Sequence, residues 1–182
     1  MIKIDFDDTY EPQEIATSLD VATFYSDLKG GGNILLKIEV SALGDPLLPN
    51  VFNLAFGPML ANGDIDDTAQ INHLNISKVF STILLFGLSY LQANPEITIG
   101  VDGSNDTRAY LYHRMFRINK EYLDEYFVPI GVDWYVRLLR NGNVENDTHG
   151  LPFFKPKPEP FDYQRIPSDL YRYYMFHLRQ NI

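Results

Sequence analysis

The stretch ISKVFSTILLFGLSYLQ, residues 76–92, decides the fold of this chain. Its apolar residues recur at helical spacing, which predicts an amphipathic helix whose apolar face is buried against a sheet. Asn75 is placed to cap the start of this helix, and Asn94-Pro95 ends it. The positions on the buried face are Ile76, Val79, Phe80, Ile83, Leu84, Gly87, Leu88 and Leu91.

Strands and further helices are expected on both sides of this helix. The turns at residues 30–33 and 44–46 bracket an alternating strand, which we expect to pair with the next strand as a hairpin. Helices that join neighbouring strands indicate an α+β fold with a mixed, mostly antiparallel sheet and crossover helices. We expect strands at residues 22–26, 34–43, 51–56, 65–71, 96–101 and 132–139, and further helices at residues 106–116 and 120–126.

The chain changes character near its end, which indicates an α+β domain over residues 1–139 and an appendage over residues 140–182. Alternating prolines at residues 154–160 favour an extended, polyproline-like path. Ser168 is placed to cap a final amphipathic helix with a tyrosine-rich stripe. Such a Pro-rich arm and helix could dock through residues 152–182 onto another protein or a second copy, or pack back on its own domain.

Composition limits the classes of partner and the compartment. The 182 residues include no cysteine, which excludes disulfides, thiolate zinc sites and thiol nucleophiles and fits a cytoplasmic protein. The net charge of −9 argues against nucleic acid and against anionic membrane surfaces as partners. The start of the chain lacks the pattern of a signal peptide, and the apolar run at residues 83–88 is too short to span a bilayer.

Four motifs are spread over about residues 9–135. They are Phe24-Tyr25-Ser26 with Lys29-Gly30; Val51-Phe52-Asn53-Leu54-Ala55-Phe56-Gly57; Ile65-Asp66-Asp67 with Lys78-Val79 and Thr82; and Gly103-Ser104 with Arg108, Leu111 and Tyr112. In this combination the chain resembles a family of uncharacterised bacterial proteins that is defined only as a domain of unknown function. The resemblance implies a shared fold and no particular activity. That family usually carries a Gly-Asp pair just before the helix lysine, whereas residues 72–77 here read NHLNIS.

A second resemblance concerns chemistry. Asn105, the pair Leu111-Tyr112 and Phe116 stand at the spacing that is typical of the acyl-CoA N-acetyltransferases. The resemblance implies an acetyltransferase-like fold, acetyl-CoA as cofactor, and Tyr112 as the general acid that protonates the CoA thiolate. The diphosphate loop of that family needs small residues where this chain has His73 and Asn75. Because Cβ atoms at both positions would crowd a diphosphate, we expect ordinary CoA binding to be absent.

A ligand site is expected between the loops at residues 70–75 and 102–106. In sheets with crossover helices, ligands bind beyond the carboxyl ends of the strands and near helix amino termini. Asp106, in the first turn of its helix, competes with any anion for that positive end. The candidate ligand- or anion-binding residues are Gln70, Asn72, Asn75, Ser104, Asn105 and Arg108.

An acidic turn at residues 64–67 lies close in sequence to His73. A calcium loop needs a longer run of oxygen ligands at fixed spacing, and the sequence has no paired histidines at ligand spacing. We therefore interpret the segment as a solvated turn and predict no metal site.

These observations lead to three functional hypotheses. The first is a non-catalytic protein-interaction module, such as an inhibitor, immunity or accessory protein, with no cofactor. The alternative is an N-acyltransferase with a remodelled acyl-CoA site, in which Tyr112 is the acid and residues 70–75 meet the diphosphate. The third is a binder of another nucleotide or anion at residues 103–108.

Overall fold

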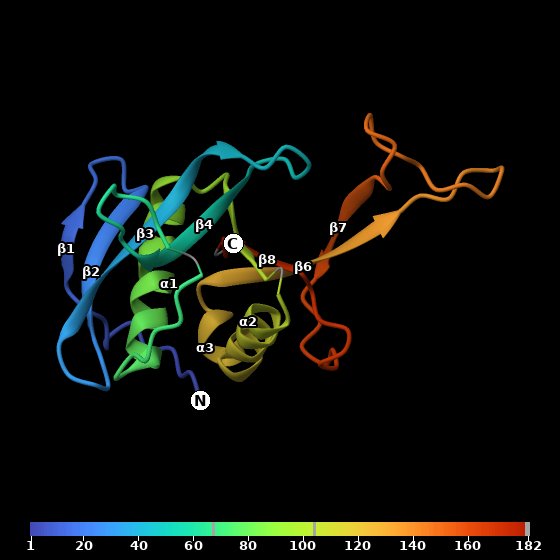
Figure 1. Cartoon of the computed structure of the whole chain (residues 1–182). Helices are drawn as coiled ribbons and strands as arrows, with labels where there is room; N and C mark the ends of the chain where they lie inside the picture. The colour runs from blue at the N-terminus through green and yellow to red at the C-terminus, as the bar shows by residue number, and fades with distance from the viewer. Residues whose placement is uncertain (67, 104, 181–182) are drawn as a thin grey trace.

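The computed structural model describes residues 1–66, 68–103 and 105–180, and its strands form an eight-stranded mixed sheet (Figure 1). The strand order is β1-β2-β3-β4-β5-β8-β6-β7, with β4 and β5 parallel and the other neighbours antiparallel. The strands are β1 (Pro12–Ile15), β2 (Val21–Asp27), β3 (Asn33–Gly44), β4 (Val51–Pro58), β5 (Thr98–Asp102), β6 (Phe127–Val136), β7 (Phe154–Pro160) and β8 (Tyr173–Leu178). The helices are α1 (Ile76–Ala93), α2 (Asp106–Ile118) and α3 (Lys120–Leu123).

Helix α1 confirms the prediction from its sequence. The side chain of Asn75 accepts a hydrogen bond from the backbone N–H of Lys78 at 3.1 Å, and Asn94 caps the other end. A Cβ at Gly87 would lie 3.6 Å from the side chains of Ile99 and Phe176, so the helix packs close to the sheet. By length and composition α1 is apolar enough to cross a membrane. This is weak evidence for a membrane span, because the buried core helix of a globular protein meets the same test.

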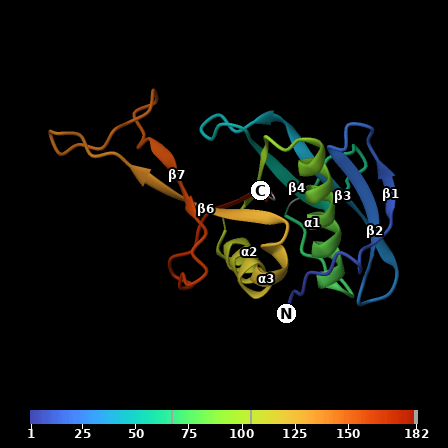
Figure 2. The same ribbon diagram turned by 180° about the vertical axis from the view of Figure 1, so that it is seen from behind.

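Helices α1 and α2 cover the same face of the sheet. The rings of Tyr112 and Phe116, on α2, lie 5.8 Å from Tyr174 and 6.0 Å from Phe176, on β8. Figure 2 shows α1 lying along this same face over β2, β3 and β4. Right-handed crossovers that run in one direction along a sheet place their helices on one side, which accounts for the arrangement.

The predicted final helix is wrong. Residues 173–178 form β8, which lies in the sheet between β5 and β6. The run Tyr173 to Phe176 is buried at every position, as is expected of a central strand with both faces covered. A short apolar run fits the helical and the strand period equally, so local pattern cannot separate them. The sheet therefore contains strands from both segments of the chain, before and after the change of composition at residues 139 and 140.

Two smaller predictions also need correction. Residues 65–71 form no strand in the part of the chain described, and Ile65 makes only a single backbone pairing with Met59. The turn around Asp64 and Asp66 is held by local side-chain hydrogen bonds, which compete with strand pairing. Strand β1 was not expected from the sequence, and it pairs with β2 at the edge of the sheet.

The proline-rich segment is an edge strand whose prolines share one orientation. Pro156, Pro158 and Pro160 alternate along β7, which pairs with β6 on one side only. Proline has no N–H, so the ladder to β6 uses the residues between the prolines, and the proline nitrogens face outward. Phe161 continues the alternation of the residues between the prolines, and its N–H donates to Pro129 O of β6 at 3.4 Å. The outer edge of β7 therefore offers few donors to another strand.

The connection between β6 and β7, residues 137–153, projects away from the sheet as an arm (Figures 1 and 2). Within the arm, Leu138 pairs with Val144 and Asn146 with Pro152, and the N–H of Phe153 donates to Glu145 O. The arm lies beyond one edge of the sheet, whereas β1 forms the opposite edge.

Candidate functional site

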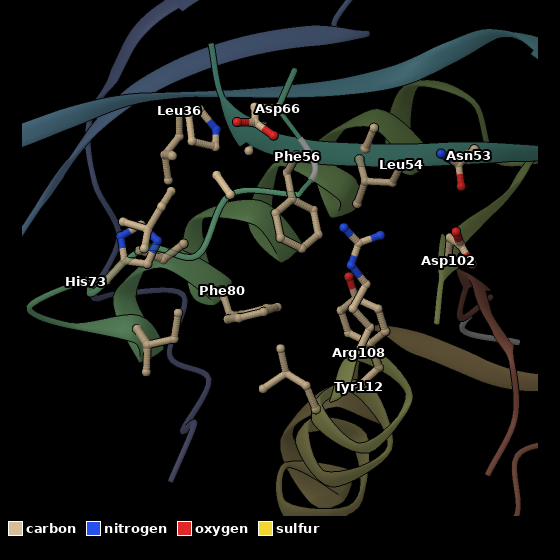
Figure 3. Close-up of a pocket in the computed structure, with 18 residues that line it drawn as sticks. Leu36, Asn53, Leu54, Phe56, Asp66, His73, Phe80, Asp102, Arg108 and Tyr112 are labelled. Carbon is tan, nitrogen blue, oxygen red and sulfur yellow. The ribbon is translucent and has the colours of Figure 1, made fainter. Parts of the chain in front are cut away.

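A cavity of about 280 Å³ opens between the carboxyl-terminal half of β4 and the start of α2 (Figure 3). Its walls are mainly apolar, with a few polar groups, as is usual for small-molecule sites. The cavity lies between the same two loops that the sequence marks as the place for a site. The lining residues are Leu36, Asn53, Leu54, Ala55, Phe56, Gly57, Pro58, Asp66, Ala69, Ile71, His73, Ile76, Val79, Phe80, Asp102, Arg108, Leu111 and Tyr112.

The cavity exists because β4 and β5 diverge. Their parallel pairing covers only residues 51–53 with 98–100, although β4 continues to Pro58. Beyond this point β4 pairs with β3, and the N–H of Met59 donates to Leu35 of that strand. At the end of β4, Pro58 O accepts a hydrogen bond from the N–H of Asp66 at 2.9 Å. Antiparallel ladders alternate, so the carbonyl of Leu54 and the backbone groups of Phe56 point away from β3 and toward the cavity, beyond the last pair with β5. An extended ligand that carries amides could pair with them as a further strand would.

Tyr112 forms the inner wall of the cavity on α2. Figure 3 shows Tyr112 and Arg108 pointing from α2 toward β4. Burial raises the pKa of Tyr112 to about 12, an effect that the Arg108 guanidinium opposes and the Asp102 carboxylate reinforces. The side chain is 6% exposed, so its hydroxyl can meet only a molecule that enters the cavity. At neutral pH Tyr112 is therefore a protonated donor facing an apolar space.

His73 borders the cavity on the side away from Tyr112 (Figure 3). Its Nδ1 lies 2.7 Å from Oγ of the fully buried Ser26 on β2. Burial lowers the pKa of His73, so the imidazole is neutral at physiological pH. The sequence gave no signal for this contact, because it depends on the pairing of the loop with the β2–β3 turn.

The loop at residues 70–75 is not arranged to bind a diphosphate. Gln70, Asn72 and Asn75 are exposed and do not line the cavity. The backbone N–H of Leu74 donates to Asp27 O at 2.8 Å, so this amide is already in use. Asn75 is occupied as the cap of α1. Residues 64–75 also contain no lysine or arginine, and an anion there would meet acidic neighbours.

The start of α2 contributes one predicted residue to the cavity. Asn105 is exposed and caps the helix by accepting a hydrogen bond from Arg108 N at 2.9 Å. The side chain of Arg108 lines the cavity. Asp106 pairs with Arg172 at 2.6 Å and places its carboxylate near the positive end of the helix. Ser104 lies outside the residues that the structure describes.

The acidic turn around Asp64 and Asp66 shows no cluster of metal ligands among its described residues. Within residues 1–66, 68–103 and 105–180, no group of three or more His, Asp or Glu side chains is arranged to hold a metal ion. Asp66 accepts hydrogen bonds from the backbone and hydroxyl of Thr68, which lower the pKa of its carboxyl. Asp67, the third acid of the turn, lies outside the described residues.

The fold and the cavity define an α+β protein with a mixed, mostly antiparallel sheet and a site at the carboxyl end of its parallel strands. Residues 7–142 match the model of the Family of unknown function (DUF6934), and the chain belongs to this family. No curated protein matches the chain significantly. No solved structure matches it significantly either. The family match ends before β7 and β8, although β8 lies between two strands that it includes.

Proposed function

We propose that the protein is an acyltransferase-like enzyme that binds the pantetheine arm of an acyl thioester in the cavity between β4 and α2. The observation that carries this proposal is the divergence of the parallel strands β4 and β5 beside Tyr112. The carbonyl of Leu54 and the backbone groups of Phe56 suit the amides of such an arm, and the apolar walls suit an acyl group. The resemblance to the acyl-CoA N-acetyltransferases also gains support from the two crossover helices on one face.

The chemistry assigns Tyr112 the role of proton donor. An amine nitrogen attacks the thioester carbonyl carbon, and the C–S bond breaks with its electron pair remaining on sulfur. The thiolate takes the phenolic proton of Tyr112, and the phenolate recovers a proton from water, which accepts the one lost by nitrogen. The raised pKa keeps the phenol protonated before the step, and it also makes Tyr112 a weaker acid than an ordinary tyrosine.

In this proposal the loop at residues 70–75 does not bind the diphosphate of CoA. The loop amide of Leu74 donates to Asp27 O, and the amide of Lys78 in the first turn of α1 donates to Asn75. The neighbouring carboxylates repel an anion. We therefore expect S-acetyl-pantetheine, which has no diphosphate, to bind about as tightly as acetyl-CoA. A diphosphate-binding enzyme would prefer acetyl-CoA strongly.

Thermal unfolding with each thioester tests the binding. At about 100 times its Kd, a ligand adds roughly 2.7 kcal/mol to the free energy of unfolding. Leu111→Trp fills the cavity from α2 and should abolish both shifts. If neither thioester shifts the unfolding temperature of the unaltered protein, the proposal is wrong.

Acyl transfer to an amine panel tests the catalytic role. Tyr112→Phe keeps the ring and should lower kcat roughly 100-fold or more with little effect on binding. Tyr110→Phe is the matched control, because Tyr110 is two residues away on α2 but is exposed and outside the cavity. Equal turnover by both variants would exclude Tyr112 as the acid.

A second candidate function is that of a non-catalytic interaction module, an inhibitor, immunity or accessory protein. The observation that favours it is the exposure of large apolar side chains on the arm, such as Leu138 and Leu151. Such residues outside a core often mark a protein-binding surface. Binding of thioesters without turnover, combined with a stable protein complex, would favour this function over catalysis.

A further inference from the structure

The tip of the arm carries a short motif of apolar and basic residues. Residues 137–140 read Arg-Leu-Leu-Arg, and all four are exposed. Leu138 is 70% exposed and Leu139 is 40% exposed. The arm therefore presents two aliphatic side chains between two positive charges.

An apolar groove lies at the opposite end of the sheet, between β1, β2 and α1. This outer groove has a volume of about 210 Å³ and is lined mainly by apolar side chains, among them Tyr10, Ile15, Leu19 and Phe86. The hydroxyl of Thr82, on its wall, already donates to Lys78 O and accepts from Tyr10 N. A groove with few polar groups to orient a small molecule is better suited to aliphatic side chains of a protein.

The outer groove is bordered by acidic residues. Residues 5–28, which supply most of its lining, contain seven aspartates and glutamates and no lysine or arginine. Glu11 stands between two lining residues, and Glu14 precedes Ile15. Lys78 lies nearby, with its ammonium 4.9 Å from the centre of the Tyr10 ring, and is paired with Asp8 at 3.2 Å. The rim is thus complementary in charge to the arginines of the arm.

We propose that the tip of the arm, residues 137–140, docks into the outer groove of a second copy of this chain. Leu138 and Leu139 fill the groove, and Arg137 and Arg140 pair with its acidic rim. The arm projects beyond β7, and the groove lies at the β1 edge, so the arm cannot reach the groove of its own copy (Figure 1). The contact is therefore head to tail, and copies form chains or a closed ring. This inference does not depend on the proposed acyl transfer.

Sedimentation across a concentration series tests the contact. At about 100 µM, well above the Kd of a micromolar contact, the unaltered protein should form dimers and larger species. The arm variant Leu138→Asp with Leu139→Asp, and the groove variant Ile15→Asp, should each be monomeric. Leu43→Asp is the matched control, since Leu43 is 82% exposed and lies in neither surface.

Mixing the two variants separates this contact from other modes of association. The arm variant keeps an intact groove and the groove variant keeps an intact arm, so an equimolar mixture should form a 1:1 dimer and nothing larger. Added salt should weaken the contact, because it screens the charge pairs. An unaltered protein that stays monomeric at about 100 µM overturns the proposal. A groove variant that still self-associates on its own overturns it as well.

Discussion

The hydroxyl of Tyr174, in the central strand β8, donates a 2.7 Å hydrogen bond to the backbone carbonyl of Ala109 on α2. Both residues are buried, and the Tyr174 ring also packs against Tyr112 and Phe116. The last strand of the chain is therefore part of the core beside the cavity. A helix that docks from outside would make no such contact.

This relationship predicts that the tail is essential for folding. A chain that ends at residue 172 lacks β8, leaves β5 and β6 each unpaired on one side, divides the sheet in two, and should be unfolded by circular dichroism. Tyr174→Phe removes only the hydroxyl and should lower the free energy of unfolding by about 1 kcal/mol, measured by urea titration. A truncated chain that unfolds cooperatively like the full one would show that β8 is dispensable for folding.

Gly131 predicts a second effect on stability. A Cβ at this position of β6 would lie 2.2 Å from the Tyr171 ring, which is fully buried and cannot move freely. Gly131→Ala should therefore lower the free energy of unfolding by roughly 1–3 kcal/mol. Gly30→Ala is the control, because no atom lies within 4 Å of the added Cβ. Equal stability of the two variants in chemical unfolding would contradict the packing of Tyr171 over Gly131.

His113 predicts a loss of stability in mild acid. It is buried on α2, stacks on Phe161 with ring centroids 5.3 Å apart, and has no hydrogen-bond partner for either ring nitrogen in the part of the chain described. Burial lowers the pKa of His113, and the Arg117 guanidinium acts in the same direction. The unfolded chain therefore binds a proton more readily than the folded one as the pH falls below about 6.5.

The stability contributed by neutral His113 is fully present above about pH 6.5 and is lost as the pH falls toward the lower pKa of the folded state, with a slope of up to about 1.4 kcal/mol per pH unit. His113→Phe should flatten this part of the stability profile, measured by urea titration between pH 5 and pH 8. His149→Gln, at an exposed position on the arm, should leave the profile unchanged. An unaltered slope in His113→Phe would assign the effect to another group.

The orientation of the prolines in β7 predicts a change in aggregation. Pro156→Val with Pro158→Val adds two outward N–H groups to the free edge, which should promote pairing between edges and raise light scattering at high concentration. Lys157→Val is the matched control, because the N–H of Lys157 faces β6 and the outer edge gains no donor. If the control aggregates equally, added hydrophobicity rather than edge pairing is the cause.

The candidate site was only partly predictable. The two loops around the cavity follow from the order of strands and helices, and the spacing around Tyr112 pointed to α2. Residues such as Phe56 and His73 entered the site through tertiary contacts. Gln70, Asn72 and Asn75 were predicted and lie outside the cavity, because the loop pairs with the β2–β3 turn and exposes them.

The sequence by itself determined the elements whose signals are local. The period of α1, its Asn75 cap and the alternation of β3 all act within a few residues, so they are visible without any partner. Only the tertiary structure decided that residues 173–178 form a strand, because Met175 pairs with Gly100 on one side and Ile130 on the other. The same holds for the cavity, which opens where β4 leaves β5. Pairing between distant segments sets the register and the divergence of strands, and no local pattern encodes it.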